Sequence, residues 1–469
     1  MATDLSNLDP DYVKNVIVPH SLARTYQGER LLFPMIDVKL SKENAMSDDL
    51  WGLINETWKP STENSVIVFL QALEKRGPNN RRKRIYMSAI TPDLYRPMYG
   101  DKVMRFFDKL LDIGNGGKPL MRLYLEGYFD LYWDLHLGVR GEAIPTRARR
   151  FGEALNTVLA YRDPTQSIVY GNYMLVRSNL TFLKEWIAER LADINDGKTA
   201  SPEKTFAYYW IMNAEDGKNF RQKDIVSECI HDLFAFAQWG TTAYNIMLKL
   251  STNSGDPETK AWFKKTMEGN FDRKDGAPFT PLERFVMELF RTITPNSGSL
   301  SSIEEVGTPR YERRAYMLSP HAATSLDPVH WKNPEKFDPD RYRMVPTSHQ
   351  IDEAKCEQIG FAKCPFEKTT FEVKDGRQVV LHNSGFGTVY GVVSGTPVPV
   401  CDHAGFAPFG FGYRRCPGEQ FTIRVFEDFL RKVWKDKIQF EKLDIVNPVP
   451  LPLGPAVVTG DNVGFHIAA

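Results

Sequence analysis

Cys416 stands in the part of the sequence with the clearest potential for chemistry. It closes a glycine-rich loop, and apolar residues at helical spacing follow from Phe421 onward. Because Gly418 stands at the start of that helix, Cys416 precedes unpaired backbone N–H groups and the positive end of a helix dipole, which favour a thiolate. Gly410 and Gly412 allow the loop to turn tightly or to approach a flat ligand closely. The pattern predicts a thiolate that points at a cofactor.

This loop resembles the cysteine-ligand loop of the cytochrome P450 family, in which a thiolate is the axial ligand of haem iron. Five residues match the signature positions of that family: Phe409, Gly412, Arg414, Cys416 and Gly418. The alternative, a buried cysteine in an ordinary glycine-rich turn, explains a lone cysteine better than five matched positions ahead of an amphipathic helix. The resemblance implies haem b (iron protoporphyrin IX) as the cofactor and Cys416 as the ligand of its iron.

A second set of charged residues precedes the loop. Thr280, followed by a proline, predicts the start of a helix on which Glu288 and Arg291 are three residues apart and can pair. Such a pair is a weak signal by itself, because surface salt bridges often have this spacing. Residues 327–342 resemble the P450 meander, whose arginine joins the pair in a buried structural triad. Here the resemblance implies a triad of Glu288, Arg291 and Arg341.

Residues 223–250 are apolar almost all round in their middle, which predicts one long buried helix. The segment corresponds in position to the P450 helix that crosses the haem face opposite the cysteine, where an acid and a threonine relay protons for O–O cleavage. Thr241 and Thr242 fit the pattern of that helix, but Gln238 replaces its glycine and Gly240 replaces its acid. The resemblance implies distal roles for both threonines and for Gln238, with a weakened relay. An ordinary helix hydrogen bond is the alternative for Gln238.

A basic cluster ends at Arg84 and leads into an apolar run. Basic clusters are usually solvated. By position, this one resembles the P450 helix whose arginine pairs with a haem propionate, which implies that role for Arg84. Asn80 replaces the tryptophan that is common four residues earlier, and Arg81 and Arg82 could instead face a redox partner.

The composition is that of an ordinary folded protein, with 42% hydrophobic and 25% charged residues. Lys+Arg and Asp+Glu both number 59, so no net field would attract nucleic acid or an anionic membrane. Five scattered cysteines form neither a disulfide framework nor paired zinc motifs, which indicates a reducing compartment. Since the N-terminus contains no signal-peptide core or membrane anchor, we expect a soluble, cytoplasmic protein.

The resemblance implies a single domain of P450 fold over residues 1–469, mainly α-helical with small β-sheets (an α+β protein). Residues 1–75 form a shorter N-terminal region than in most P450s. The segment of residues 343–400 makes the stretch before the cysteine loop longer than is usual in the family. Its pattern predicts an inserted β-hairpin, with Asp375 and Gly376 at its turn.

Three functions remain open from the sequence. The resemblance favours a monooxygenase that inserts oxygen into, or oxidatively couples, a hydrophobic or amphipathic small molecule, with electrons from a separate ferredoxin or flavoprotein reductase. Gly240 replaces the acid, and the pair Trp239–Gly240 resembles the corresponding helix segment of allene oxide synthases and hydroperoxide lyases. It favours a hydroperoxide-consuming isomerase, lyase or peroxygenase without a redox partner, although the cysteine-loop insertion of those enzymes is absent. The third function is non-catalytic haem binding, against which the intact Phe409, Arg414 and Cys416 argue.

Overall fold

The computed structural model consists of two compact units, which we describe separately. Unit 1 comprises Met1–Asn44, Arg76–Asn79 and Ala261–Ile423, and unit 2 comprises Ala45–Lys75, Asn80–Lys260 and Arg424–Ala469. The structure describes residues 3–4, 31–34, 81–161, 167–214, 221–295, 299–302, 315–319, 321–328, 330–345, 347, 369–381, 390–403, 405–410, 415–444, 451–453, 456–458 and 461–468. Helices predominate and the sheets are small and antiparallel, which confirms the expected fold class. Within these ranges, no helix is both long and apolar enough to span a bilayer.

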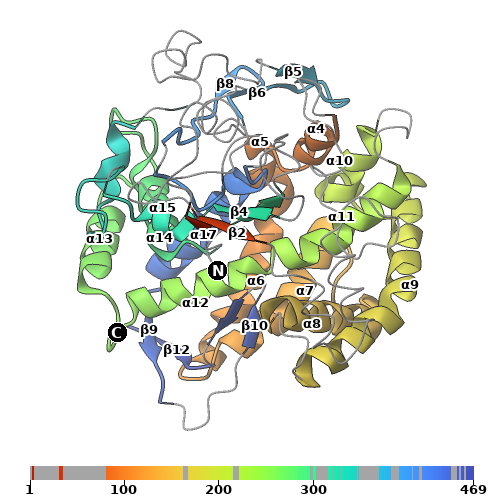
Figure 1. Ribbon diagram of the computed structural model, residues 1–469, viewed down its shortest axis with the longest axis horizontal. Coiled ribbons are helices and arrows are strands. Elements are labelled where there is room, and N and C mark those ends of the chain that lie inside the picture. Colours follow the sequence, from red (N-terminus) through yellow and green to blue (C-terminus); the bar gives the residue numbers. More distant parts are fainter. Residues whose placement is uncertain are drawn as a thin grey trace. The chain divides into compact units, whose positions relative to one another are not determined.

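Unit 2 is mostly helical (Figure 1). Helix α8 packs along α9, and α6 packs against α7. Helix α7 is buried on most of its surface, with Tyr132 and Trp133 in the core, and it ends at Gly138 in the left-handed conformation (φ 71°) that glycine allows. The main helices are α4 (Arg81–Ser88), the π-helix η3 (Tyr95–Tyr99), α6 (Gly100–Leu110), α7 (Met121–Leu137), α8 (Thr146–Tyr161), α9 (Ser167–Asn195), α10 (Phe206–Met212), α11 (Gln222–Ala235) and α12 (Gln238–Leu250).

The prediction of one long helix over residues 223–250 is wrong, because the structure has two helices, α11 and α12, which meet end to end (Figure 1). The N–H groups of Trp239 and Gly240 donate to the carbonyls of Phe236 and Ala237, three residues back, at 3.0 Å each. This tighter turn interrupts the regular α-helical ladder. The backbone angles at Phe236 and Ala237 stay close to helical values, and the apolar pattern continues, so the sequence carries no sign of the break.

Two short sheets complete unit 2. Strand β9 (Ile438–Lys442) pairs antiparallel with β12 (Val463–Ile467), and the facing residues Phe440 and Phe465 are both buried. Helix α12 packs against β9. Strands β10 (Leu451–Leu453) and β11 (Ala456–Val458) form the second pair.

Unit 1 contains α14 (Pro281–Ile293), whose start follows the sequence prediction. The Glu283 N–H donates to Thr280 Oγ1 at 3.1 Å, and the Thr280 N–H donates to Glu283 Oε2 at 2.6 Å, a reciprocal capping box. Helix α15 (His321–Ser325) and the 3₁₀ helix η9 (Pro339–Arg343) also belong to this unit. One four-stranded sheet has the order β1 (Thr3–Asp4), β2 (Leu31–Pro34), β4 (Ala315–Ser319) and β3 (Ser299–Ser302).

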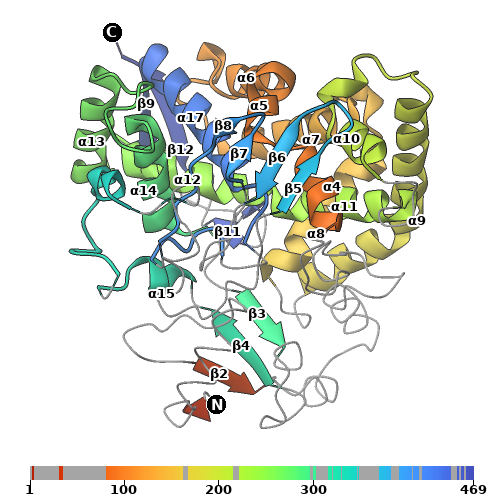
Figure 2. The same ribbon diagram turned by 90° about the horizontal axis from the view of Figure 1, so that it is seen from above.

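A second sheet of unit 1 contains the expected hairpin (Figure 2). Strand β5 (Thr369–Glu372) pairs with β6 (Gln378–Leu381) across a turn in which the Gly376 N–H donates to the Val373 carbonyl at 2.9 Å. Gly376 has φ +83°, which a residue with a side chain rarely adopts. Strands β7 (Val392–Val393) and β8 (Thr396–Pro397) extend the sheet. That this hairpin is an insertion relative to P450s stays a prediction.

Candidate functional site

The cysteine loop ends directly before α17 (Glu419–Lys435), as the sequence predicts. The Cys416 N–H donates to the Phe409 carbonyl at 2.8 Å, which closes the loop. Gly410 has φ +73°, so the loop needs a glycine at this point. A Cβ atom at Gly418 would lie 3.7 Å from Cys416 Sγ, so glycine keeps the space beside the sulfur free of a side chain. Gly412 and Arg414 lie outside the described residues.

The described cysteines have different surroundings. Cys229 and Cys401 are fully buried, and burial raises the pKa of each thiol well above its usual value, so both remain protonated. The Cys416 side chain is only half-buried and precedes a helix N-terminus. A reactive or metal-binding thiolate needs this kind of environment. Cys416 is therefore the best candidate ligand among the described cysteines.

Aromatic packing holds the start of the loop. The ring of Phe409 contacts the ring of Phe290 on α14, with centroids 5.0 Å apart, and lies 6.2 Å from the ring of Phe406. Aromatic pairs at these separations contribute stability beyond the area that they bury. Phe409, one of the five matched positions, thus connects the cysteine loop to α14.

Arg415, the residue before the cysteine, forms a buried ion pair that the sequence analysis missed. Its Nε lies 2.7 Å from Glu419 Oε2, and its Nη2 lies 2.8 Å from Glu419 Oε1. Nη2 also donates to the Cys401 carbonyl at 2.8 Å. Burial opposes the charge of Arg415, but Glu419 outweighs it and raises the guanidinium pKa above its usual value. The spacing of four residues at a helix start could have revealed this pair.

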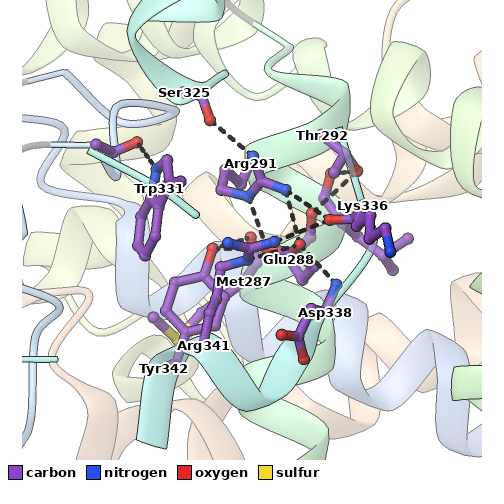
Figure 3. A network of polar contacts seen from close by, with 12 residues as sticks. Met287, Glu288, Arg291, Thr292, Ser325, Trp331, Lys336, Asp338, Arg341 and Tyr342 are labelled. Atoms are coloured by element: carbon purple, nitrogen blue, oxygen red, sulfur yellow. Dashed lines mark hydrogen bonds and ion pairs between the residues drawn. The ribbon is translucent and has the colours of Figure 1, made fainter. Parts of the chain in front are cut away.

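The structure brings Glu288, Arg291 and Arg341 together (Figure 3). Arg291 binds Glu288 in bidentate fashion, with Nε 2.7 Å from Oε2 and Nη2 2.8 Å from Oε1. Arg341 Nε donates to Glu288 Oε1 at 3.0 Å. The side chains of Glu288 and Arg291 are 0% exposed, so this is a fully desolvated ion pair rather than the surface salt bridge that its spacing alone suggested.

Further donors complete the shell of Glu288 (Figure 3). The Asp338 N–H donates to Oε1 at 2.9 Å, and the Tyr342 hydroxyl donates to Oε2 at 3.1 Å. Burial, followed by the charge of Glu288, raises the pKa of Tyr342 well above its usual value, so its hydroxyl keeps its proton. Arg291 Nη1 donates to the Ser325 carbonyl at 2.8 Å. These partners depend on tertiary contacts, which the sequence motif does not identify.

Trp331 links the triad to the segment that leads into the cysteine loop. The guanidinium carbons of Arg291 and Arg341 lie 5.8 and 5.3 Å from the centre of its ring. Its indole Nε1 donates to the Gly405 carbonyl at 3.0 Å, and its ring stacks on His403 with centroids 4.0 Å apart. One buried tryptophan therefore contacts both the triad and residues just before the loop.

The predicted distal residues lie on the first turns of α12 in unit 2. Thr242 is buried, and its Oγ1 donates to the Gln238 carbonyl at 3.0 Å. The side chains of Gln238 and Thr241 are half-buried. The Thr241 carbonyl accepts from Asn245 Nδ2 at 2.8 Å. The Thr242 hydroxyl thus bonds within its own helix.

Arg84 lies on α4, also in unit 2, and its side chain is half-buried. Two residues later, the Tyr86 hydroxyl is 2.9 Å from Asp232 Oδ1 and 2.9 Å from Asp232 Oδ2. Asn80 lies outside the described residues. The basic cluster therefore opens a helix that is attached to α11.

Comparison with known proteins finds likeness in structure only. The sequence matches no protein-family model and no curated protein. Cytochrome P450DA (haem domain) aligns with a TM-score of 0.57 at 13% identity, over 94% of this chain and 87% of that chain. The retinoic acid-bound cyanobacterial CYP120A1 aligns with a TM-score of 0.54 at 15% identity, over 84% and 80%. Cytochrome P450SP alpha (CYP152B1) in complex with (R)-ibuprophen aligns with a TM-score of 0.54 at 15% identity, over 91% and 86%.

Proposed function

We propose that this chain, which has the cytochrome P450 fold, is a haem-thiolate oxidoreductase with Cys416 as the axial ligand of haem iron. The observation that carries the proposal is the loop itself. It holds a half-buried cysteine before the N-terminus of α17, whereas Cys229 and Cys401 are sealed in the core. Haem b, when bound, would supply an iron centre to which the thiolate donates electron density, which favours O–O cleavage.

The described residues fit such a group. Gly418 leaves the space beside Cys416 Sγ free of a side chain, and the hydrogen bond from Cys416 N–H to the Phe409 carbonyl fixes the direction of the loop. Arg415 adds no net charge there, because its guanidinium pairs with Glu419. Beyond Cys416, the proposed haem contacts are Phe409, Gly412, Arg414 and Gly418 on the cysteine side and Arg84 at a propionate.

The leading candidate reaction is a monooxygenation, or an oxidative coupling, of a hydrophobic or amphipathic small molecule. A separate ferredoxin or flavoprotein reductase would deliver the electrons. Thr241 and Gln238, both half-buried, are the side chains of α12 that we propose to orient water or the oxygen donor.

A second candidate is a reaction that consumes an organic hydroperoxide and needs no reductase. Gly240 stands where the family pattern has an acid, and the Thr242 hydroxyl donates to the Gln238 carbonyl within α12. Both features weaken a proton relay, which hydroperoxide chemistry requires less than activation of O₂ does.

Replacement of the cysteine tests the proposed ligand. We expect Cys416→Ala to abolish the red-shifted Soret band of the reduced carbon monoxide complex, the band for which the family is named, because a thiolate ligand is required for it. Cys229→Ala is the matched control, since it removes a fully buried thiol from α11 and should keep the band. A Cys416→Ala protein that retains the band would refute the assignment.

Kinetics separate the two candidate reactions. The haem-loaded protein is mixed with a fatty-acid hydroperoxide in the absence of NAD(P)H and reductase, and loss of the hydroperoxide is followed by chromatography. Rapid turnover, lost in Cys416→Ala, would establish the second candidate. Turnover of a small-molecule panel only with reductase and NAD(P)H would establish the first.

A further inference from the structure

Helix α11 carries a cluster of metal-binding side chains that the proposed function does not use. His231 and Asp232 follow Glu228 by three and four residues, so both side chains lie next to that of Glu228 on the helix surface. Glu228 and Asp232 are 2% and 0% exposed, and His231 is 16% exposed. The cluster is thus almost fully desolvated, with His231 as its most accessible member.

Two of the distances within the cluster fit coordination of a common ion. His231 Nδ1 lies 3.4 Å from Glu228 Oε2 and 3.4 Å from Asp232 Oδ1, and the three ligand atoms lie within 4.8 Å of one another. Tetrahedral zinc, with bonds of about 2.0–2.2 Å to nitrogen and oxygen, separates its ligand atoms by roughly 3.3–3.6 Å.

Residues of two other helices orient Asp232, as outer-shell partners orient a metal-binding carboxylate. The Tyr86 hydroxyl of α4 lies 2.9 Å from each of its oxygens, and His136 Nε2 of α7 lies 3.0 Å from Oδ2. His136 is held in turn by Nδ1, which lies 2.9 Å from the Tyr132 carbonyl. This support fixes Asp232 Oδ1 on the side of His231.

We propose that Glu228, His231 and Asp232 of α11 form a zinc site, in which residues of α4 and α7 orient the ligand Asp232. One imidazole nitrogen and two carboxylate oxygens suit Zn²⁺, and three protein ligands leave a fourth position for water. The partly exposed His231 marks the route by which the ion enters. The site is independent of Cys416 and of the proposed haem.

Metal analysis of the haem-loaded protein tests the site. The chain is stripped with EDTA, equilibrated with ZnCl₂, freed of unbound metal by gel filtration and assayed by plasma mass spectrometry. We expect one zinc per chain and an increase of the melting temperature with zinc concentration. His231→Gln and Asp232→Asn should weaken zinc binding at least 100-fold. His136→Gln should weaken it about 10- to 100-fold, as loss of an outer-shell partner does.

A histidine–carboxylate pair at the surface provides the matched control. His466 Nδ1 lies 4.0 Å from Glu441 Oε2, and His466→Gln should leave zinc affinity unchanged. Wild-type protein that retains no zinc, or equal zinc binding by wild type and His231→Gln, would overturn the site. If the buried variants do not fold, Tyr86→Phe tests the site. It leaves all three ligands intact and should weaken zinc binding about tenfold. The haem content of these variants should stay unchanged. A loss of zinc binding can therefore be distinguished from a failure of the proposed haem site.

Discussion

At the scale of single residues, Glu288 shows why a buried charge can be retained in this fold. Its two oxygens accept from Arg291, Arg341, the Tyr342 hydroxyl and the Asp338 N–H. A desolvated carboxylate is costly unless its lone pairs are satisfied, and here each oxygen has at least two donors. The network is therefore sensitive to the loss of any charged member.

Removal of that charge should be strongly destabilising. We expect Glu288→Gln to lower the free energy of unfolding by about 3–5 kcal/mol, because two guanidinium groups lose their buried counter-charge. Urea denaturation followed by circular dichroism measures the change.

The control for this variant is Lys265→Gln. Lys265 Nζ lies 3.9 Å from Asp340 Oδ2 in an exposed pair and 3.8 Å from the centre of the Trp262 ring. Loss of both contacts should change the free energy of unfolding by no more than about 1 kcal/mol. Equal stability of the Glu288→Gln protein and the wild type would contradict the structural role of the triad.

At the scale of elements, backbone conformation decides where glycine is required. Gly376 closes the β5–β6 turn with φ +83°, and Gly171 lies exposed within α9 without a positive φ. A Cβ atom at either position would meet no atom within 4 Å, so steric clash does not distinguish them. The difference lies in the backbone alone, since alanine disfavours the left-handed region and favours a helix.

Alanine at these two positions should have opposite effects. Gly376→Ala should lower the free energy of unfolding by about 1 kcal/mol, and Gly171→Ala should raise it by about 0.5–1 kcal/mol. Thermal and urea denaturation of both variants in one buffer provide the comparison. A change of the same sign in both would argue against the positive φ at Gly376.

At the scale of the whole molecule, the loss of stability at low pH depends on carboxylates that the fold keeps ionised. Asp275 lies 2.9 Å from both terminal nitrogens of Arg284 and also contacts Arg343, and it thereby connects α14 to η9. The hydrogen bond from Arg284 is the largest effect on the carboxyl, and together with Arg343 it lowers the pKa of Asp275 far below its usual value. A group with a depressed pKa contributes stability above its unfolded pKa, and that contribution is lost as the pH falls toward the folded value.

Asp275→Asn should therefore destabilise the protein at neutral pH. The difference from the wild type should shrink as the pH falls below about 4, the ordinary pKa of aspartate, because the wild-type carboxylate then loses its advantage. Urea midpoints of both proteins measured from neutral to acidic pH test the sign. A difference that grows on acidification would refute the role of this ion pair.

Sequence patterns predicted those features that depend on nearby residues. The start of α14 after Thr280, the start of α17 after Gly418 and the β5–β6 turn all follow from residues within one or two turns of chain. The meander arginine was found only through the resemblance. The break between α11 and α12 was missed because the apolar pattern runs through it.

Other parts of the candidate site depend on residues far apart in the chain. Tyr342 and Trp331 reach the triad through tertiary packing, which no local pattern specifies. The spacing of Arg415 and Glu419 could have predicted their ion pair. It could not have predicted that the pair is buried, with Arg415 donating to the Cys401 carbonyl. That both units form the single domain that the resemblance implies stays a prediction.

The indole of Trp331 has a consequence for the order in which the chain folds. Arg341 and Glu288 are 53 residues apart, and Trp331 and Gly405 are 74 apart, so each contact closes a loop at an entropic cost that must be met before the contact stabilises anything. Since Trp331 packs against the triad arginines, we expect the triad to assemble before Gly405 docks on the indole. A Cβ atom at Gly405 would lie 2.2 Å from Trp331 Nε1, so only a bare backbone can complete this step. We therefore expect a defect at Glu288 to slow the formation of the cysteine loop.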